Sequence, residues 1–215
     1  MNINNIEFKI TKNSIDKANH IVKNMDGSSF HNHYHILYDI CESFNDEIVY
    51  LEIGTFCGGS AALVASHSNV RHVVSIDLGT PINKDIPIKN VNKFKNKNCK
   101  YDYIEGNSSA PSTHKKLNSI INSVDILFID GDHSKQGVLN DFKTYSKYVK
   151  PGGYIVFDDY NDYKFSPQVK DGVNHIVNNL LDNNYIIIGD LYYPELKFTN
   201  TNKKTSNEFI IKKIK

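Results

Sequence analysis

The feature that most constrains the fold is the run from Tyr50 to Leu63, where an apolar strand-like segment ends in an acidic, glycine-rich turn and continues directly into a helix-like segment. Glycines let the backbone adopt φ values that other residues resist and let it approach a ligand closely. The first N–H groups of the helix that follows have no partner within the helix, so they can face a ligand. The run predicts a turn that cradles a nucleotide-like ligand, although an ordinary strand-to-helix turn would use the same kinds of residue.

The spacing of the turn residues distinguishes between ligands. A dinucleotide-binding fingerprint reads G-x-G-x-x-G, whereas this chain reads E-x-G-x-x-x-G-G-S from Glu52 to Ser60. The pattern resembles motif I of the class I S-adenosylmethionine (SAM)-dependent methyltransferases. The resemblance implies SAM as the cofactor and a cofactor-binding role for Glu52, Gly54, Phe56, Gly58 and Ser60.

Apolar strand-like runs alternate along the chain with helix-length segments, which is typical of a doubly wound α/β domain. We expect a Rossmann-like α/β fold with a mostly parallel sheet of seven strands and additional N-terminal helices. The predicted strands are Ile48–Ile53, His72–Asp77, Lys100–Glu105, Val124–Asp130, Tyr154–Asp158, Tyr185–Gly189 and Glu208–Ile214. The predicted helices are Ser14–Lys23, His35–Phe44, Ser60–His67, Ser112–Asn122, Gln136–Tyr148 and Val169–Leu181, with a stop and a turn at Pro151-Gly152-Gly153.

Length and composition limit the number of domains. At 215 residues and 40% apolar content, the chain is long enough for one well-buried domain and short for two. We predict a single methyltransferase domain over residues 1–215, with an N-terminal helical lid at residues 1–45 and a catalytic core at residues 46–215.

Charge and cysteine content bear on partners and location. A net charge of +1 argues against nucleic acid or an anionic membrane surface as a partner. The three cysteines are widely spaced and odd in number, so we expect reduced thiols and a cytoplasmic location. The N-terminus lacks the apolar core of a signal peptide, and no apolar run approaches membrane-spanning length. The oligomeric state stays open, a homo-oligomer included.

Polar residues follow the second and third predicted strands. Asp77 ends the second strand, where a carboxylate can accept hydrogen bonds from both hydroxyls of a ribose. The same aspartate could instead cap the loop that follows. Asn107 and Ser108 follow the third strand, where class I methyltransferases usually place a polar residue beside the adenine. We therefore add Asp77, Asn107 and Ser108 to the cofactor-binding set.

Aspartates follow the fourth and fifth predicted strands. In an open parallel sheet the ligand lies outside the carboxyl ends of the strands, so Asp130, Asp158 and Asp159 can converge on one point. Carboxylates that lie close together need a counterion, and Mg²⁺ prefers such hard oxygen ligands. We predict a metal site of Asp130, Asp158 and Asp159, in which Asp130 also belongs to the catalytic and cofactor-binding sets. Loop caps are the alternative, because Asp is common after strands.

His133 lies three positions after Asp130 and is the predicted general base. Its reference pKa of about 6.5 leaves the imidazole largely neutral at cellular pH, so it can take a proton from a hydroxyl group. A structural histidine that caps the next helix or holds an aspartate is an equal alternative. We expect Asp132 to hold the loop or to line the adenine edge rather than to bind a metal. We place the cluster from His31 to His35 in a lid or pocket wall rather than in a zinc site, because no cysteine or acidic partner is near it in sequence.

A more specific resemblance rests on three segments. Leu51–Ser60 resembles motif I of the catechol O-methyltransferases, and the three aspartates match the metal ligands of that group in position. The segments 128–137 and 150–160 are similar to a bacterial methyltransferase family related to macrolide-sugar O-methyltransferases and cephalosporin hydroxylase-like proteins. The catechol enzymes carry Asp-Asn where this chain has Asp158-Asp159, and a lysine base where it has His133. The extra carboxylate favours a retained metal but argues against a catechol acceptor.

This resemblance implies a SAM-dependent O-methyltransferase that acts on a hydroxyl of a small molecule, a sugar or a sugar-containing metabolite, with assistance from Mg²⁺ or Mn²⁺. Other classes remain open. A NAD-dependent oxidoreductase would share the fold and Asp77, but the glycine spacing argues against it. A metal-dependent hydroxylase or hydrolase on the same fold would leave Gly54 and Asp77 unexplained. A non-catalytic cofactor-binding protein would have no use for the aspartates.

Overall fold

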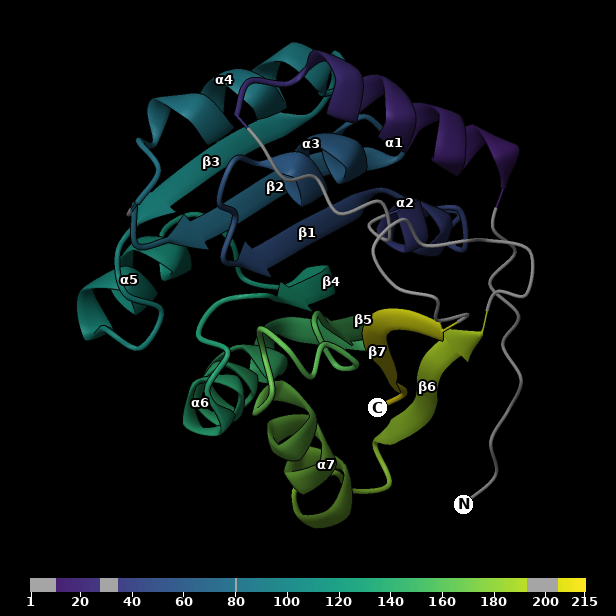
Figure 1. Cartoon of the computed structure of the whole chain (residues 1–215), viewed down its shortest axis with the longest axis vertical. Helices are drawn as coiled ribbons and strands as arrows, with labels where there is room; N and C mark the ends of the chain where they lie inside the picture. Colours follow the sequence, from purple (N-terminus) through teal and green to yellow (C-terminus); the bar gives the residue numbers. More distant parts are fainter. Residues whose placement is uncertain (1–10, 28–34, 80, 193–204) are drawn as a thin grey trace. The chain divides into compact units, whose positions relative to one another are not determined.

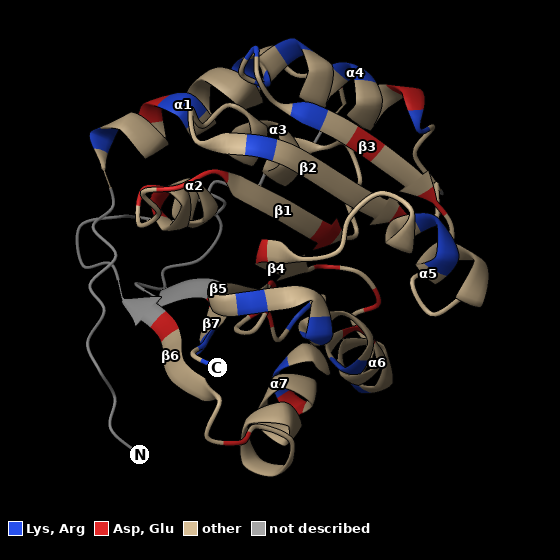
Figure 2. Cartoon of the chain, turned by 180° about the vertical axis from the view of Figure 1, so that it is seen from behind, with Lys and Arg blue, Asp and Glu red and all other residues tan. Residues whose placement is uncertain are grey.

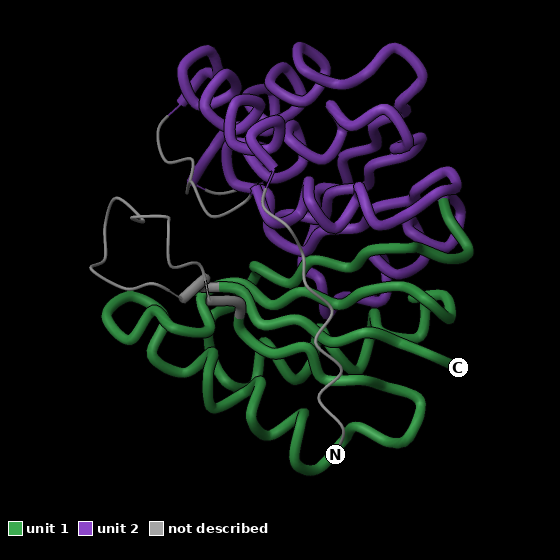
Figure 3. Tube along the Cα trace, turned by 90° about the vertical axis from the view of Figure 1, so that its right-hand side faces the viewer, with its two compact units in different colours: residues 1–6, 121–215 green, residues 7–120 purple. Residues whose placement is uncertain are grey.

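The computed structural model describes residues 11–27, 35–79, 81–192 and 205–215. The described residues group into two compact units, which Figure 3 shows in purple and green. We call residues 11–120 the N-terminal unit and residues 121–215 the C-terminal unit. This division does not coincide with the predicted boundary between a lid and a core at residue 45, and the single-domain organisation stays a prediction.

The N-terminal unit contains three parallel strands in the order β3-β2-β1 (Figure 1). The strands are β1 (Ile48–Ile53), β2 (Val70–Asp77) and β3 (Lys100–Glu105), and the helices are α1 (Lys12–Asn24), α2 (His35–Cys41), α3 (Gly59–Ala65), α4 (Asp85–Phe94) and α5 (Pro111–Asn118). Ile53 pairs with Ile76, and Asp77 pairs with Glu105. The carboxyl ends of the three strands therefore lie at one edge, where the predicted cofactor-binding residues follow them.

The C-terminal unit contains four strands in the order β4-β5-β7-β6. The strands are β4 (Val124–Ile129), β5 (Val149–Phe157), β6 (Tyr185–Tyr192) and β7 (Thr205–Lys213), and the helices are α6 (Lys135–Tyr145), a 3-10 turn (Ser146–Tyr148) and α7 (Val169–Asn179). β4 and β5 are parallel, whereas β7 runs antiparallel to both of its neighbours. Every residue of β4 is buried, as expected for a strand covered on both faces.

The predicted fold class is confirmed: the chain has an α/β fold with seven mostly parallel strands and flanking helices. Strands β1 and β3 have the predicted bounds, and the other predicted strands and helices are each present with shifted ends. The sequence analysis missed α4. Apolar residues such as Pro87, Val91 and Phe94 recur in it at helical spacing, but Pro81, Pro87 and the polar residues between them favour a loop.

The predicted stop before Pro151 is confirmed, since α6 ends at Tyr145 and the 3-10 turn at Tyr148, but the predicted turn at Pro151-Gly152-Gly153 is wrong, because these residues lie inside β5. The pairing with β4 shifts there, since Val124 pairs with Val149 but Ile126 pairs with Tyr154. The intervening residues form a bulge in which Pro151 and Gly152 are exposed. A bulge tolerates proline, because a residue outside the ladder does not need to donate a hydrogen bond.

Acidic and basic residues are interspersed along the elements of each unit (Figure 2). The net charge of +1 therefore reflects a mixture of charges within both units. Within the described ranges, none of the helices combines the length and the apolar character that crossing a membrane would require.

The two bulge glycines allow a matched test of the backbone. A Cβ on Gly153 would lie 2.6 Å from the Asp125 carbonyl oxygen and 3.0 Å from the Lys150 carbonyl oxygen, whereas a Cβ on Gly152 would meet nothing within 4 Å. We expect Gly153→Ala to lower the free energy of unfolding by about 2–3 kcal/mol, because backbone oxygens cannot rotate away. Gly152→Ala should cost about 1 kcal/mol, the strain of its φ of +87°. Urea unfolding measures both, and an equal or smaller loss for Gly153→Ala would contradict the geometry.

Candidate functional site: a glycine turn and an Asp-His-Asp cluster

The glycine turn after β1 has an unusual backbone. Gly54 and Gly58 have φ values of +84° and +81°, and Phe56 between them has a φ of +46°. Among the residues that the structure describes, Phe56 and Asp159 are the non-glycine residues with positive φ. Such backbone strain concentrates at ligand-binding and active sites. The Phe56 side chain is 43% exposed, so it is open to a ligand.

A buried carboxylate lies beneath this turn. Glu52 is fully buried, and its two oxygens accept hydrogen bonds from four hydroxyl groups. The donors are Tyr50 (3.0 Å), Ser60 (2.8 Å), Ser75 (2.8 Å) and Thr55. Thr55 belongs to the turn and Ser60 to the first turn of α3, so one carboxylate joins both ends of the predicted motif. Burial raises the pKa of Glu52 to about 7, although the hydroxyl groups oppose the shift.

Asp77 holds the same turn from the end of β2. Its Oδ2 accepts the backbone N–H groups of Thr55 (2.8 Å) and Phe56 (3.1 Å), and its Oδ1 accepts that of Gly79 (2.8 Å). The capping role that the sequence left open is therefore present. Because a carboxylate oxygen can accept two hydrogen bonds, Oδ1 keeps acceptor capacity for a further donor.

The polar residues after β3 lie at the same edge. Gly106 donates its N–H to the Asp77 carbonyl oxygen at 2.8 Å, which fixes the start of this loop beside the end of β2. Asn107 accepts the N–H of Ser109 at 2.8 Å through its side chain, and the Ser108 carbonyl oxygen lies 2.6 Å from Nε2 of His114. The structure therefore brings the turn, Asp77 and the Asn107 loop together within the N-terminal unit.

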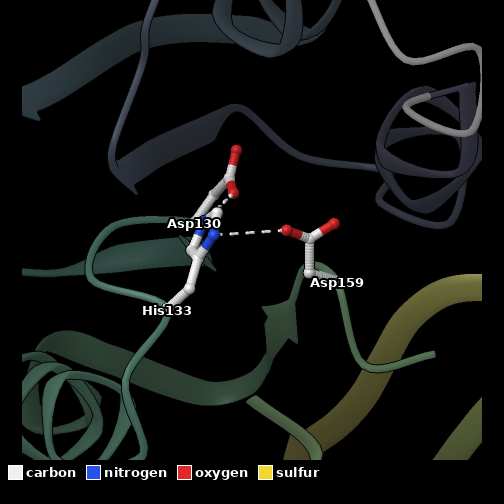
Figure 4. A group of neighbouring side chains, drawn as sticks. All are labelled: Asp130, His133 and Asp159. Atoms are coloured by element: carbon white, nitrogen blue, oxygen red, sulfur yellow. Dashed lines mark hydrogen bonds and ion pairs between the residues drawn. The ribbon is translucent and has the colours of Figure 1, made fainter. Parts of the chain in front are cut away.

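A second cluster lies in the C-terminal unit, where Asp130 and Asp159 follow the parallel strands β4 and β5 (Figure 4). Nε2 of His133 lies 3.3 Å from Oδ1 of Asp130, and Nδ1 of His133 lies 3.5 Å from Oδ2 of Asp159. One donor atom from each of the three side chains lies within 4.8 Å of the others. The hydrogen bond with Asp130 raises the pKa of His133, although burial opposes the shift.

The sequence analysis missed Ser166. Its buried hydroxyl lies 2.9 Å from Nδ1 of His133 and donates to Oδ2 of Asp159 at 2.5 Å. Ser166 is separated from His133 by 33 positions and belongs to no motif, so the sequence carried no signal for this contact.

Asp158 directly precedes Asp159 at the end of β5. Its side chain is buried, its Oδ1 accepts the N–H of Asp159 at 2.8 Å, and it is not one of the three described side chains that form the candidate ion-binding group. Asp132 accepts the N–H of Ser134 at 2.9 Å and so holds the loop, as predicted. The predicted lid cluster lies outside the described residues except for His35, which is buried in α2.

Comparisons with known proteins agree with this architecture. Residues 51–160, which include the glycine turn and both aspartate segments, match the family described as a methyltransferase domain. Over 163 residues the chain is 44% identical to "Uncharacterized protein R132" of Acanthamoeba polyphaga mimivirus, which covers 75% of this chain and 74% of that protein. The chain belongs to the methyltransferase-domain family, and with this fold it is a class I SAM-dependent methyltransferase.

Solved structures share the fold at low identity. An O-methyltransferase from Bacillus cereus in complex with SAH (S-adenosylhomocysteine) matches with a TM-score of 0.61 and 19% identity, over 95% of this chain and 92% of that chain. The MycE methyltransferase from the mycinamycin biosynthetic pathway, in complex with Mg, SAH and mycinamycin VI, matches with a TM-score of 0.59 and 16% identity. That match covers 94% of this chain and 54% of MycE. None of these matches favours an oxidoreductase, a hydroxylase or a hydrolase.

The buried Glu52 predicts a specific pH dependence of stability. Its folded-state pKa of about 7 lies above its ordinary value of 4.5, so the folded protein keeps a proton that the unfolded chain releases between these values. The free energy of unfolding should therefore fall as pH rises from about 4.5 to 7, by about 3 kcal/mol for this group. Glu52→Gln lacks the ionisation, so its stability relative to wild type should rise over the same window.

Urea unfolding of both proteins across this pH range measures the difference. Glu47→Gln is the matched control, because this carboxylate is 73% exposed and pairs with Arg71 at the surface. Parallel stability curves for wild type and Glu52→Gln would show that burial of Glu52 does not shift its ionisation.

Proposed function

We propose that this protein transfers a methyl group from SAM to a hydroxyl of a small molecule, a sugar or a sugar-containing metabolite, with divalent metal assistance. The observation that carries the proposal is the cluster of Asp130, His133 and Asp159, which combines carboxylates with an imidazole base in one unit. The MycE complex with Mg, SAH and mycinamycin VI supports it by analogy of fold.

The N-terminal unit would hold SAM. The turn from Gly54 to Gly58 and the N–H groups that follow would approach the ligand, and the remaining acceptor capacity of Asp77 would bind ribose hydroxyls. Asn107 and Ser108 would border the adenine. Bound SAM supplies an electrophilic methyl group. Because Glu52 is enclosed by its four hydroxyl donors, we assign it the support of the turn, through Thr55 and Ser60.

The C-terminal cluster fits a divalent cation by its donor chemistry. Asp130 and Asp159 offer hard carboxylate oxygens from two neighbouring strand ends, and Asp159 is held there in a backbone conformation with a φ of +58°. A bound cation would lower the pKa of an acceptor hydroxyl. Asp158 stays in the proposed ligand set.

His133 is the proposed general base. Its ring is 42% exposed, so a hydroxyl group can reach it, and Asp130 stabilises the imidazolium that forms when it takes a proton. His133 would take the proton of the reacting hydroxyl as the methyl group passes from the sulfonium sulfur of SAM to the hydroxyl oxygen, and the broken methyl–sulfur bond would leave S-adenosylhomocysteine. The residues that would contact the acceptor lie in loops, including the segment 161–170.

The cytoplasmic location is also a proposal. Cys41, Cys57 and Cys99 are buried and form no disulfide bond, which suits a reducing compartment. Burial raises the pKa of the Cys99 thiol to about 11, so this sulfur stays a thiol at neutral pH. We also propose that the protein can form a homo-oligomer.

Asp77→Ala tests the cofactor site. It removes the proposed ribose acceptor together with the acceptor for two turn N–H groups, so we expect SAM binding to weaken by about 1–3 kcal/mol, roughly 5- to 150-fold in Kd. Calorimetric titration with SAM and SAH measures the change. Asp102→Ala is the control, because this carboxylate lies within β3 and pairs with His72 and Lys100, away from the turn. An Asp77→Ala protein that folds and binds SAM with wild-type affinity would remove Asp77 from the site.

Chelation tests the metal. Transfer of labelled methyl from SAM to a panel of sugars and glycosides should stop in EDTA and return with Mg²⁺ or Mn²⁺, while SAM binding persists in the chelator. Asp159→Asn should raise the metal concentration needed for half-maximal rate by about 10- to 100-fold. Asp158→Asn should raise it as well, because Asp158 is in the proposed ligand set. Full activity in EDTA would exclude a metal role, and no transfer to any acceptor hydroxyl under any condition would contradict the proposed function.

A further inference from the structure

Helix α4 packs directly against the glycine turn. A Cβ on Gly58 would lie 3.0 Å from Cα and 3.2 Å from the carbonyl oxygen of Pro87, so the backbones of the turn and of the helix are in contact. Further along α4, the side chain of Asn90 is fully buried. Glu52 and Asp77 hold the turn from β1 and β2, whereas Pro87 and Asn90 contact it from α4.

The side-chain amide of Asn90 joins the turn to the segment that follows α1. Its Nδ2 donates to the carbonyl oxygens of Cys57 and Asp26, each at 2.8 Å, and its Oδ1 accepts the N–H of Asp26 at 2.8 Å. Both N–H donors of the amide are therefore used. Because Asp26 presents one donor and the other two partners are acceptors, a single orientation of the amide satisfies all three contacts.

The contact with Cys57 fixes a peptide group of the turn on both sides. The Cys57 carbonyl oxygen accepts from Asn90, and the N–H of the same peptide group, on Gly58, donates to the Thr55 carbonyl oxygen at 2.6 Å. A rotation of this peptide group would break both hydrogen bonds and change the φ of Gly58, which is +81°. Asn90 therefore stabilises the backbone conformation of the turn from the side of α4.

The segment held by Asn90 also covers the Cys57 side chain. A Cβ on Gly27 would lie 2.7 Å from Sγ and 3.4 Å from Cβ of Cys57, so the Gly27 backbone packs against that side chain. Cys57 is accordingly 2% exposed. Since Asn90 binds both backbone groups of Asp26, loss of its amide should release this segment and expose the sulfur.

We propose that Asn90 is a positioning residue of the cofactor site, which holds the glycine turn in the conformation that binds SAM and couples that conformation to the packing of residues 26–27. The inference rests on the proposed binding of SAM at this turn. Asn90 acts indirectly, because its buried amide is fully used by backbone groups. Without the amide, the turn spends less time in the binding conformation, and the apparent Kd rises by the reciprocal of that fraction.

Asn90→Ala and Asn96→Ala form a matched pair. Nδ2 of Asn96 also donates to backbone carbonyl oxygens, those of Ala65, His67 and Val70 at 2.6–3.1 Å, but Val70 begins β2, whereas the turn lies at the other end of that strand. Both variants should lower the midpoint of urea unfolding. Calorimetric titration should show a Kd for SAM about tenfold higher in Asn90→Ala alone, the effect of one lost hydrogen bond on the population of the turn.

The accessibility of Cys57 gives a readout that needs no SAM. A thiol reagent, with mass spectrometry to locate the label, should modify Cys57 of folded Asn90→Ala about tenfold faster than in wild type, because labelling follows the population of the open conformation. Cys41 and Cys99 are also buried and report general opening. Saturating SAM should slow the labelling of Cys57 in wild type, since SAM binds the closed conformation.

Gly27→Ala disturbs the same contact from the other side and keeps the test decisive if Asn90→Ala does not fold. Its Cβ would meet the Cys57 sulfur, and its φ of +87° resists a side chain. We therefore expect Gly27→Ala to raise the Kd for SAM and to speed the labelling of Cys57, while the amide of Asn90 stays in place.

A wild-type Kd for SAM in Asn90→Ala, or an equal rise of the Kd in Asn96→Ala, would overturn the inference. Labelling of Cys57 at the wild-type rate in Asn90→Ala and Gly27→Ala would also overturn it. A wild-type protein that binds no SAM would contradict the proposed function itself, and the role of Asn90 with it. If wild type binds SAM and the variants behave like it, only the inference fails, so the two failures are distinguishable.

Discussion

The buried carboxylate of Glu52 is the interaction on which the glycine turn depends. The contacts described for this buried carboxylate are all with hydroxyl groups. Their hydrogen bonds offset the free-energy cost of burying it. Since Thr55 and Ser60 stand on opposite sides of the turn, the carboxylate fixes its width. Asp77 then satisfies the N–H groups at the tip of the turn. The strained backbone conformation of Phe56 is maintained because Glu52 of β1 and Asp77 of β2 both hold the turn in place.

The Asp-His-Asp cluster of the C-terminal unit is also held by a network of hydrogen bonds and ion pairs. The parallel pairing of β4 and β5 brings Asp130 and Asp159 close, and the loop that carries Ser166 returns to close the network. His133 contacts a different side chain on each ring nitrogen, so the orientation of its ring is constrained. A titratable side chain that is held between charged and polar groups in this way is typical of a site that transfers a proton or binds a cation.

The sequence predicted the secondary-structure elements whose ends are marked by nearby residues. β1 and β3 have the predicted bounds because alternation of apolar runs with turn residues marks their ends, and the turn at Gly54 follows from glycine spacing. The failures also have physical causes. α4 was missed because the prolines and polar residues around its start favour a loop, although apolar residues recur along it at helical spacing. Pro151 indicated a turn, but a bulge let the strand continue through it.

By itself, the sequence determined the α/β class, the methyltransferase family and the strand ends at which polar residues gather, because each depends on spacing along the chain. Only the tertiary structure decided which of these residues contact one another. It grouped Asp159 rather than Asp158 with Asp130 and His133, and it brought Ser166 to the ring. Adjacent residues at a strand end point in different directions, and a contact between distant loops depends on how the chain returns, so neither is encoded in local spacing.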